Sequence, residues 1–251
     1  MRDEWKGFID ACATVGIMPD PAQIDALDAY YRILTEKNKV MNLTAITSFE
    51  DVWKLHFLDS LAILFAARDE DGTPILKQTG KETVLDIGTG AGFPGVVLKI
   101  FCPGLRLTLL DAQEKRVLFL EEVAEALSLR KDGELRIVHA RAEDLARDNA
   151  HRARYDLAVS RAVAKCAVLT EYAVPFLKRG AVFAAYKSSA IEEELSESTR
   201  ALQLLGAEIA AVPRYTLPGT DVERSLVCIR KTSETDDRYP RRASKIQKSP
   251  L

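Results

Sequence analysis

The feature that most constrains this chain is a glycine-rich turn that follows a short apolar stretch. Residues 83–87 read Thr-Val-Leu-Asp-Ile, and glycines then stand at positions 88, 90, 92 and 95. Glycine permits positive φ and lets a ligand approach the backbone closely. A helix that starts after the turn would add free N–H groups. We therefore expect a buried strand that ends in a ligand-binding turn.

Two cofactors fit such a turn, and Asp86 distinguishes between them. Residues 90–95 match the dinucleotide pattern G-x-G-x-x-G, whereas Asp86, Gly88 and Gly90 place a carboxylate at the strand end. An anionic pyrophosphate gains nothing from that carboxylate, but the ammonium and sulfonium of S-adenosylmethionine do. Asp86 thus favours S-adenosylmethionine. The alternatives are that Asp86 only caps the turn, and that the chain is an NAD-dependent oxidoreductase.

Strand and helix patterns alternate after this turn. We expect strands over 83–87, 105–111, 135–139, 155–160, 181–187, 207–213 and 225–231, with helices over 96–101, 114–127, 167–177 and 190–205. Alternation of this kind indicates a mostly parallel sheet. The last two strands have no helix between them and should be antiparallel. The expected fold is a Rossmann-like α/β fold of the class I methyltransferase type, with a seven-stranded, mostly parallel sheet whose last strand is antiparallel.

The chain divides into three expected parts. Residues 1–70 carry helical apolar spacing, with Asp20 as a helix cap before Pro21 and a second cap at Ser48, and form a helical N-terminal extension. Residues 71–233 form the S-adenosylmethionine-binding core. Residues 234–251 form a basic C-terminal tail.

Composition excludes several classes of protein. The 251 residues are 47% hydrophobic with a net charge of −2, and no apolar run approaches the roughly 20 residues that span a bilayer. The scattered cysteines suggest neither a zinc site nor a disulfide framework; they are Cys12, Cys102, Cys166 and Cys228. We expect a cytoplasmic, monomeric protein without a metal site or membrane contact.

Further cofactor contacts are expected where later strands end. Asp111 ends the second strand, where a carboxylate accepts hydrogen bonds from ribose hydroxyls. Ala142 and Glu143 follow the third strand, at the place of the adenine pocket, although acids there also suit the first turn of a helix. Arg161 ends the fourth strand at the reactive end of the site. It would clamp a carboxylate or phosphate, or else form a surface salt bridge.

Two absences restrict the methylated atom. The fourth strand is not followed by the Asn/Asp-Pro-Pro-Tyr/Phe turn used for amino-group methylation. Methylation at pyrimidine C5 needs a cysteine nucleophile, and Cys166, the nearest in sequence, has no flanking proline and falls in an expected helix. The target atom should therefore already be nucleophilic.

Several residues are candidates for contacts with RNA. His56 lies three residues before Asp59 on an expected helix, so the two side chains can meet; a buried, satisfied histidine is the alternative. Lys187 would touch phosphate or remain solvated. The segment 238–248 holds five basic residues and no acid, which suits an RNA backbone or a solvated tail. Its candidates are Arg238, Arg241 and Arg242.

Taken together, these residues resemble the RsmG (GidB) family of bacterial small-subunit rRNA guanine-N7 methyltransferases. The resemblance runs from about Asn42 to the C-terminus. It rests on Asn42-Leu43-Thr44, His56 to Leu61, Asp86 to Gly95, Leu110-Asp111, Lys115-Arg116, Phe119-Leu120, Arg141-Ala142-Glu143, Ser160-Arg161-Ala162 and Tyr186-Lys187.

The resemblance implies transfer of a methyl group from S-adenosylmethionine to N7 of one guanine in the 530 loop of 16S rRNA, within the small ribosomal subunit or its precursor. It also implies cofactor contacts from Gly88, Phe93, Ala142, Glu143 and Arg161. Guanine N7 carries a lone pair and no proton, so in-line displacement needs alignment and no general base. A non-catalytic ribosome-binding factor on the same fold is a further alternative.

Overall fold

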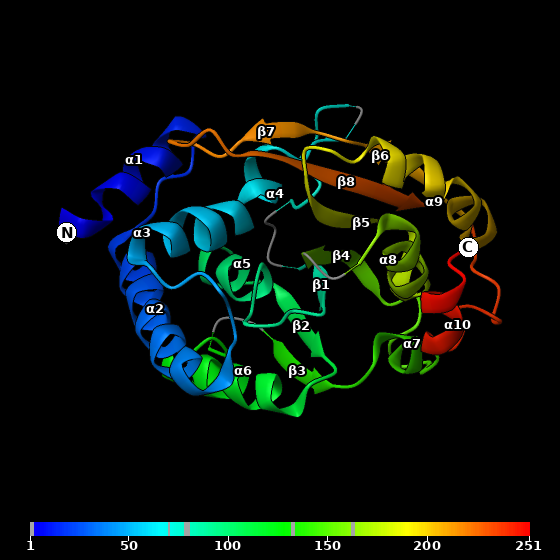
Figure 1. Ribbon diagram of the computed structural model, residues 1–251, viewed down its shortest axis with the longest axis horizontal. Helices are drawn as coiled ribbons and strands as arrows, with labels where there is room; N and C mark the ends of the chain where they lie inside the picture. Colours follow the sequence, from blue (N-terminus) through cyan, green and yellow to red (C-terminus); the bar gives the residue numbers. More distant parts are fainter. Residues whose placement is uncertain (1–2, 70, 78–80, 132–133, 162–163) are drawn as a thin grey trace.

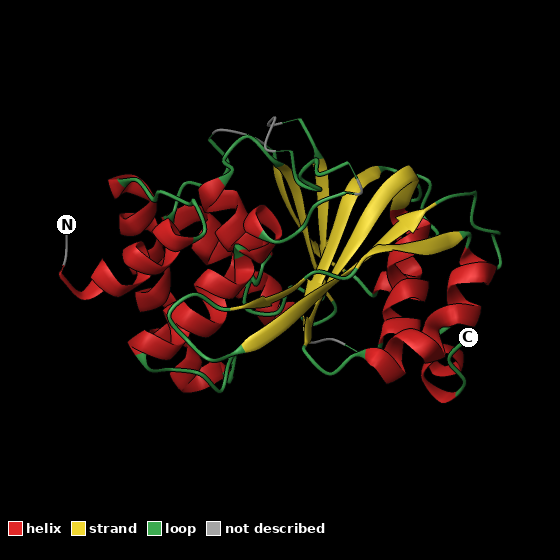
Figure 2. Ribbon diagram, turned by 90° about the horizontal axis from the view of Figure 1, so that it is seen from above, coloured by secondary structure: helices red, strands yellow, loops and turns green. Residues whose placement is uncertain are grey.

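The computed structural model describes residues 3–69, 71–77, 81–131, 134–161 and 164–251, which form a central sheet with helices on both faces (Figures 1 and 2). The strands are β1 (Thr83–Ile87), β2 (Arg106–Asp111), β3 (Leu135–His139), β4 (Tyr155–Arg161), β5 (Leu177–Ser188), β6 (Ala207–Ala211), β7 (Arg214–Thr216) and β8 (Glu223–Lys231). The helices are α1 (Lys6–Thr14), α2 (Pro21–Met41), α3 (Phe49–Val52), α4 (Ala62–Phe65), α5 (Gly95–Phe101), α6 (Glu114–Ala126), α7 (Ala142–Leu145), α8 (Cys166–Ala173), α9 (Glu192–Leu205) and α10 (Ala243–Lys248).

The sheet has the order β3-β2-β1-β4-β5-β8-β6, and β7 pairs with β8 beside that path. β1 to β5 are parallel to one another, whereas β8 runs antiparallel to β5, β6 and β7. The Rossmann-like fold and its reversed strand are thus confirmed. The described sheet has eight strands rather than seven, because β7 is an additional strand of three residues. It is too short and too exposed to produce an apolar pattern in the sequence.

Successive residues of each central strand face opposite layers of helices. On β1, Val84 belongs to the apolar core under α2, α5 and α6, whereas Leu85 and Ile87 belong to the core under α8 and α9. This alternation follows from the period of two along a strand. Both faces of the parallel sheet are therefore buried, and the glycine turn after β1 begins from a rigid layer.

The N-terminal helices cover one of these faces (Figure 2). α2 begins at Asp20, whose side chain accepts a hydrogen bond from the Gln23 N–H at 2.8 Å while Gln23 caps Asp20 in return, so the predicted helix start is confirmed. A π-helical segment, Trp53–Leu58, lies between α3 and α4. Residues of α1, α2 and this segment share one apolar core with the sheet.

The C-terminal segment is folded against the core. Tyr239 and Ile246 are buried, and Arg152 donates hydrogen bonds to the carbonyls of Thr235 (2.8 Å) and Tyr239 (2.9 Å). α10 packs on α8 (Figure 1). The segment has few apolar residues and is held by arginine–carbonyl bonds, so helical spacing did not predict α10. Within the described part of the chain, no helix is both long and apolar enough to cross a membrane.

Candidate active site

The glycine turn after β1 separates into two functional halves. Gly88 and Gly90 have φ of +66° and +61° and line an open cavity. Gly92 has φ of +99°, and a Cβ at this position would lie 2.5 Å from the Tyr30 hydroxyl. A Cβ on Gly95 would similarly collide with Asp86 and a side chain of β2. The first two glycines therefore open the site, whereas the other two allow close packing beneath it.

Asp86 lies fully buried beneath this turn. Its Oδ2 accepts hydrogen bonds from the Thr89 hydroxyl at 2.7 Å and the Gly95 N–H at 2.8 Å, so it does cap the turn. Its Oδ1 is also buried, yet has no hydrogen-bond partner among the described residues. Burial raises the pKa of Asp86 to about 6. A cation above the turn would stabilise the charged form of this carboxylate.

Asp111 connects the end of β2 to the turn. Its Oδ2 accepts the Gly90 N–H at 2.9 Å, and its Oδ1 accepts the Gln113 N–H at 2.8 Å. Arg116 approaches the same carboxylate at 3.4 Å. A carboxylate oxygen has two lone pairs. Asp111 lines the cavity and can therefore accept a further hydrogen bond from a hydroxyl group.

Two cavities meet at this edge of the sheet. The first has a volume of about 810 Å³ and lies between the turn, the helical extension and the ends of β4 and β5; its lining includes Thr44, His56, Phe93, Arg161, Lys187 and Arg224. The second measures about 430 Å³ and is lined by Ala142, Glu143, Tyr172, Gln247 and Pro250, among others. Gly88 and Ala112 line both. The junction lies where the strand order reverses beside β1, which is the usual ligand site of such sheets.

The second cavity brings together two regions that are distant in sequence. Glu143, only 7% exposed, accepts a hydrogen bond from Arg141 Nε at 2.8 Å. Across the cavity stand Gln247 and Pro250, held in place because Ile246 is buried against α8. Ala142 and Glu143 both line this cavity. The wall supplied by the C-terminal segment was not predicted.

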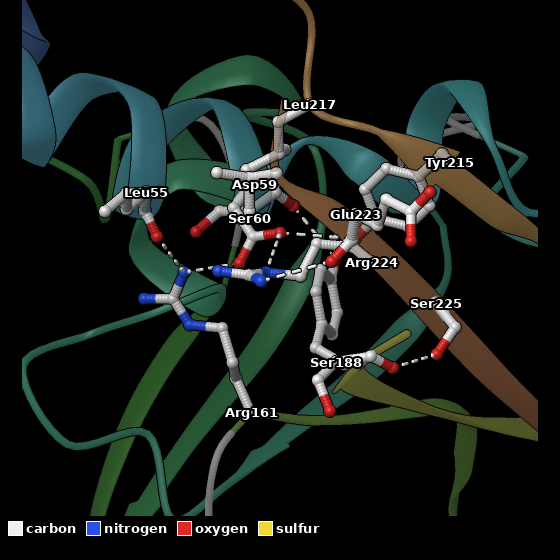
Figure 3. Close-up of polar contacts among 12 residues, drawn as sticks. Leu55, Asp59, Ser60, Arg161, Ser188, Tyr215, Leu217, Glu223, Arg224 and Ser225 are labelled. Carbon is white, nitrogen blue, oxygen red and sulfur yellow. Dashed lines mark hydrogen bonds and ion pairs between the residues drawn. The ribbon is translucent and has the colours of Figure 1, made fainter. Parts of the chain in front are cut away.

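Arg161 joins the core to the helical extension (Figure 3). Its Nη1 donates hydrogen bonds to the Leu55 carbonyl at 3.0 Å and to Asp59 Oδ2 at 3.1 Å. Its guanidinium lies 5.0 Å from the centre of the Phe93 ring. The side chains of Arg161 and Asp59 are only 12% and 5% exposed, so this is a buried ion pair rather than a surface salt bridge.

His56 is held neutral by its partners. Arginine can only donate, so the contact of 3.0 Å between Arg161 Nη2 and His56 Nδ1 requires Nδ1 to accept. The proton then lies on Nε2, which donates to the Thr44 hydroxyl at 2.8 Å. Burial and the charge of Arg161 lower the pKa of His56 to about 3. The ring stacks on Phe93 at 4.5 Å. Asp59, the expected neighbour of His56, pairs with Arg161 instead.

The remaining candidates are divided between the cavity and the surface. Lys187 lines the first cavity, but its Nζ bonds the Ala164 carbonyl at 2.7 Å and Glu194 at 2.6 Å. Arg241 forms a two-pronged ion pair with Glu171, which is fully buried. We therefore do not retain Arg241 as an RNA contact.

Arg238 and Arg242 lie exposed on the C-terminal segment. Ala162, part of the motif around Arg161, lies outside the described residues. Cys166 is buried at the start of α8, and burial raises the pKa of its thiol to about 12, which disfavours a thiolate nucleophile.

Two arginines in the first cavity were not predicted as site residues. Arg116 appeared only within the family resemblance, and Arg224 lies one residue before the strand expected over 225–231, although it belongs to β8. Their side chains are 31% and 28% exposed. No local signal marks Arg224, because its place in the cavity depends on the pairing of β8 with β5.

Comparisons with known proteins identify the family. The family model described as rRNA small subunit methyltransferase G matches residues 23–227. A relative of that name from Lachnoclostridium phytofermentans is 42% identical over 251 residues, covering 100% of this chain and 98% of the relative. Another, from Alkaliphilus oremlandii, is 45% identical over 230 residues, covering 92% and 91%.

Solved structures support the fold. The structure of P. horikoshii TYW2 in complex with MeSAdo aligns with a TM-score of 0.50 at 13% identity, covering 70% of this chain and 62% of that one. At this identity the likeness concerns the fold alone. The family match spans most of the sequence and the relatives align over nearly their whole length, so the chain belongs to the rRNA small subunit methyltransferase G family.

Proposed function

We propose that this protein transfers a methyl group from S-adenosylmethionine to N7 of a guanine in the 530 loop of 16S rRNA. The observation that carries the proposal is the pair of cavities that adjoin at Gly88, one beside buried carboxylates and one beside Ala142 and Glu143. Family membership supports the rRNA substrate, and the chemistry of the cavities supports the cofactor.

The residues present fit this cofactor better than NAD. The methionine part would lie at Gly88, Gly90 and Phe93, above the buried Asp86, whose Oδ1 is free of hydrogen bonds within the described chain. Asp111 would accept hydrogen bonds from the ribose hydroxyls. The Asp86 carboxylate at this turn would repel a pyrophosphate, whereas it attracts the ammonium and sulfonium. The adenine would lie in the second cavity.

The chain's side chains suit a reaction without a general base. Both ring nitrogens of His56 are hydrogen-bonded and its pKa is low, so it does not take a proton. The bound cofactor supplies an electrophilic methyl group on a cationic sulfur. The work left to the protein is to align the guanine and to exclude water. The packed group of Phe93, His56 and Arg161 forms a rigid wall for that purpose at the reactive end.

The RNA would enter on the side of the first cavity. Arg116, Lys187 and Arg224 line it, and Arg238 and Arg242 are exposed on the C-terminal segment. We propose the small ribosomal subunit or its precursor as the partner, a monomeric enzyme, and the cytoplasm as its location because ribosomes assemble there.

The test is methyl transfer from labelled S-adenosylmethionine to small subunits and naked 16S rRNA from cells that lack the gene, followed by mass mapping. One added methyl on one guanine of the 530 loop, with the strand-cleavage chemistry typical of N7-methylguanosine, is expected. Cofactor binding without transfer to either substrate would favour a non-catalytic ribosome-binding factor. Thermal stabilisation by NAD and not by S-adenosylmethionine would favour the oxidoreductase.

A further inference from the structure

The first cavity holds a surplus of positive charge at one end. Asp59 lies between two guanidinium groups, those of Arg161 and Arg224 (Figure 3). Asp59 Oδ2 accepts a hydrogen bond from Arg161 at 3.1 Å, and Asp59 Oδ1 accepts one from the Tyr215 hydroxyl at 3.2 Å. Arg224 Nε stays 3.8 Å from Oδ1, beyond hydrogen-bond distance. One carboxylate thus balances only one of two arginines.

The other basic groups of the cavity differ in this respect. Lys187 has its own acid in Glu194 at 2.6 Å. Arg116 has Asp111 at 3.4 Å. The surplus charge therefore belongs to Arg224, whose side chain is 28% exposed and faces the cavity.

The backbone of Arg224 lies away from the glycine turn, and its guanidinium shares Asp59 with Arg161. Arg224 stands on β8 opposite Ser188 of β5, and β8 is separated from β1 by β4 and β5. Three strand spacings of about 4.8 Å put its backbone about 14 Å from the strand that leads into the glycine turn. An anion bound by Arg224 would accordingly be part of the substrate rather than the carboxylate of the methionine moiety.

We propose that Arg224 binds a phosphate group of the RNA strand beside the target nucleotide, and so positions the substrate. This inference rests on the proposed function. A guanidinium fork matches the oxygens of a phosphate, and phosphates supply most of the electrostatic attraction of RNA. Among the described residues, Arg224 Nη1 donates one hydrogen bond, to the Glu223 carbonyl at 3.2 Å, and Nε stays beyond hydrogen-bond distance of Asp59, so the guanidinium keeps N–H groups for a phosphate.

The test compares Arg224→Gln with Arg200→Gln, which removes the same charge from an exposed position on α9. RNA affinity is measured over a range of salt concentrations, and the affinity for S-adenosylmethionine is measured separately. We expect Arg224→Gln to weaken RNA binding about tenfold and to reduce the slope of log affinity against log salt by about 0.7 to 1. Arg224→Lys keeps the charge and should keep the slope.

Three outcomes would overturn the inference. The first is a slope for Arg224→Gln equal to that of Arg200→Gln. The second is weaker cofactor binding with an unchanged slope, which would assign Arg224 to the cofactor carboxylate. The third, which needs no variant, is that ethylation of each phosphate next to the target leaves binding to the wild type unaffected. Methyl transfer by the wild type is measured first, so failure of the proposed function is recognised separately.

Discussion

Replacing Arg161 by glutamine should destabilise the entire fold, because the buried Asp59 would lose its hydrogen-bonded ion-pair partner and keep only Arg224, whose Nε lies 3.8 Å away. The Asp59 side chain is 5% exposed, and Arg161 supplies its ion pair at 3.1 Å. Breaking a buried ion pair by removing one partner costs about 3–5 kcal/mol. For a chain of this size, each kcal/mol lowers Tm by roughly 2–4 °C, so a loss of roughly 6–20 °C is expected.

The assay is urea unfolding followed by circular dichroism, performed on Arg161→Gln, Asp59→Asn and the double variant. Removing both charges also removes the carboxylate that has lost its hydrogen-bonded partner, so the double variant should be more stable than the sum of the single losses predicts. A coupling on the order of 2 kcal/mol is expected. Arg200→Gln, an exposed change of the same charge, should stay within about 0.5 kcal/mol of the wild type.

Two results would refute this reasoning. One is an unfolding free energy of Arg161→Gln within about 0.5 kcal/mol of the wild type, the range of ordinary surface substitutions. The other is additivity of the two single changes, which would show that the carboxylate and the guanidinium do not stabilise one another in the folded protein.

Three further predictions concern the two cavities. Gly92→Ala should lower the unfolding free energy by about 2 kcal/mol or more, because the new Cβ would lie 2.5 Å from the Tyr30 hydroxyl. The same urea titrations measure this loss. A variant as stable as the wild type would contradict the packing role of Gly92. The affinity for S-adenosylmethionine should fall as the pH drops below about 6, the pKa to which burial raises Asp86, because the protonated carboxyl no longer attracts the cation. Without the cofactor, the raised pKa of Asp86 stabilises the folded protein at low pH, and this stability is lost as the pH rises from about 4 through about 6. Calorimetry on Asp86→Asn should find neither the pH dependence of cofactor affinity nor that of stability. If both pH profiles of the variant equal those of the wild type, Asp86 is excluded as the cause. Ile246→Asp should weaken cofactor binding, because Ile246 holds the wall of the second cavity against Tyr172. An unaltered cofactor affinity in fluorescence titrations would remove α10 from the site.

The parts of the fold that depend on local patterns were predictable. β1 and β3 have the predicted bounds, because apolar residues of each strand are followed directly by turn residues. The helix start at Asp20 and Pro21 was equally predictable, since both residues act within the first helical turn; the return cap from Gln23 was not predicted. In each case the residues that determine the structure lie close together in sequence.

The features that escaped prediction depend on partners far away in the chain. Asp59 binds Arg161, about a hundred residues later, and the π-helical segment before it directs the Leu55 carbonyl to the same guanidinium. The segment before α10 is fixed by arginine bonds to its carbonyls, and α10 itself has one buried side chain, Ile246. Such contacts leave no periodic pattern, so the sequence indicated the residue types at the site but not their pairing.

The most direct test of this account is the structure of the protein with S-adenosylmethionine bound. The account predicts the adenine in the cavity beside Glu143 and Gln247, the ribose at Asp111, and the methionine part at Gly88 and Gly90, so that the methyl group opens toward Arg161. A cofactor with its adenine in the larger cavity, or bound away from the glycine turn, would contradict it.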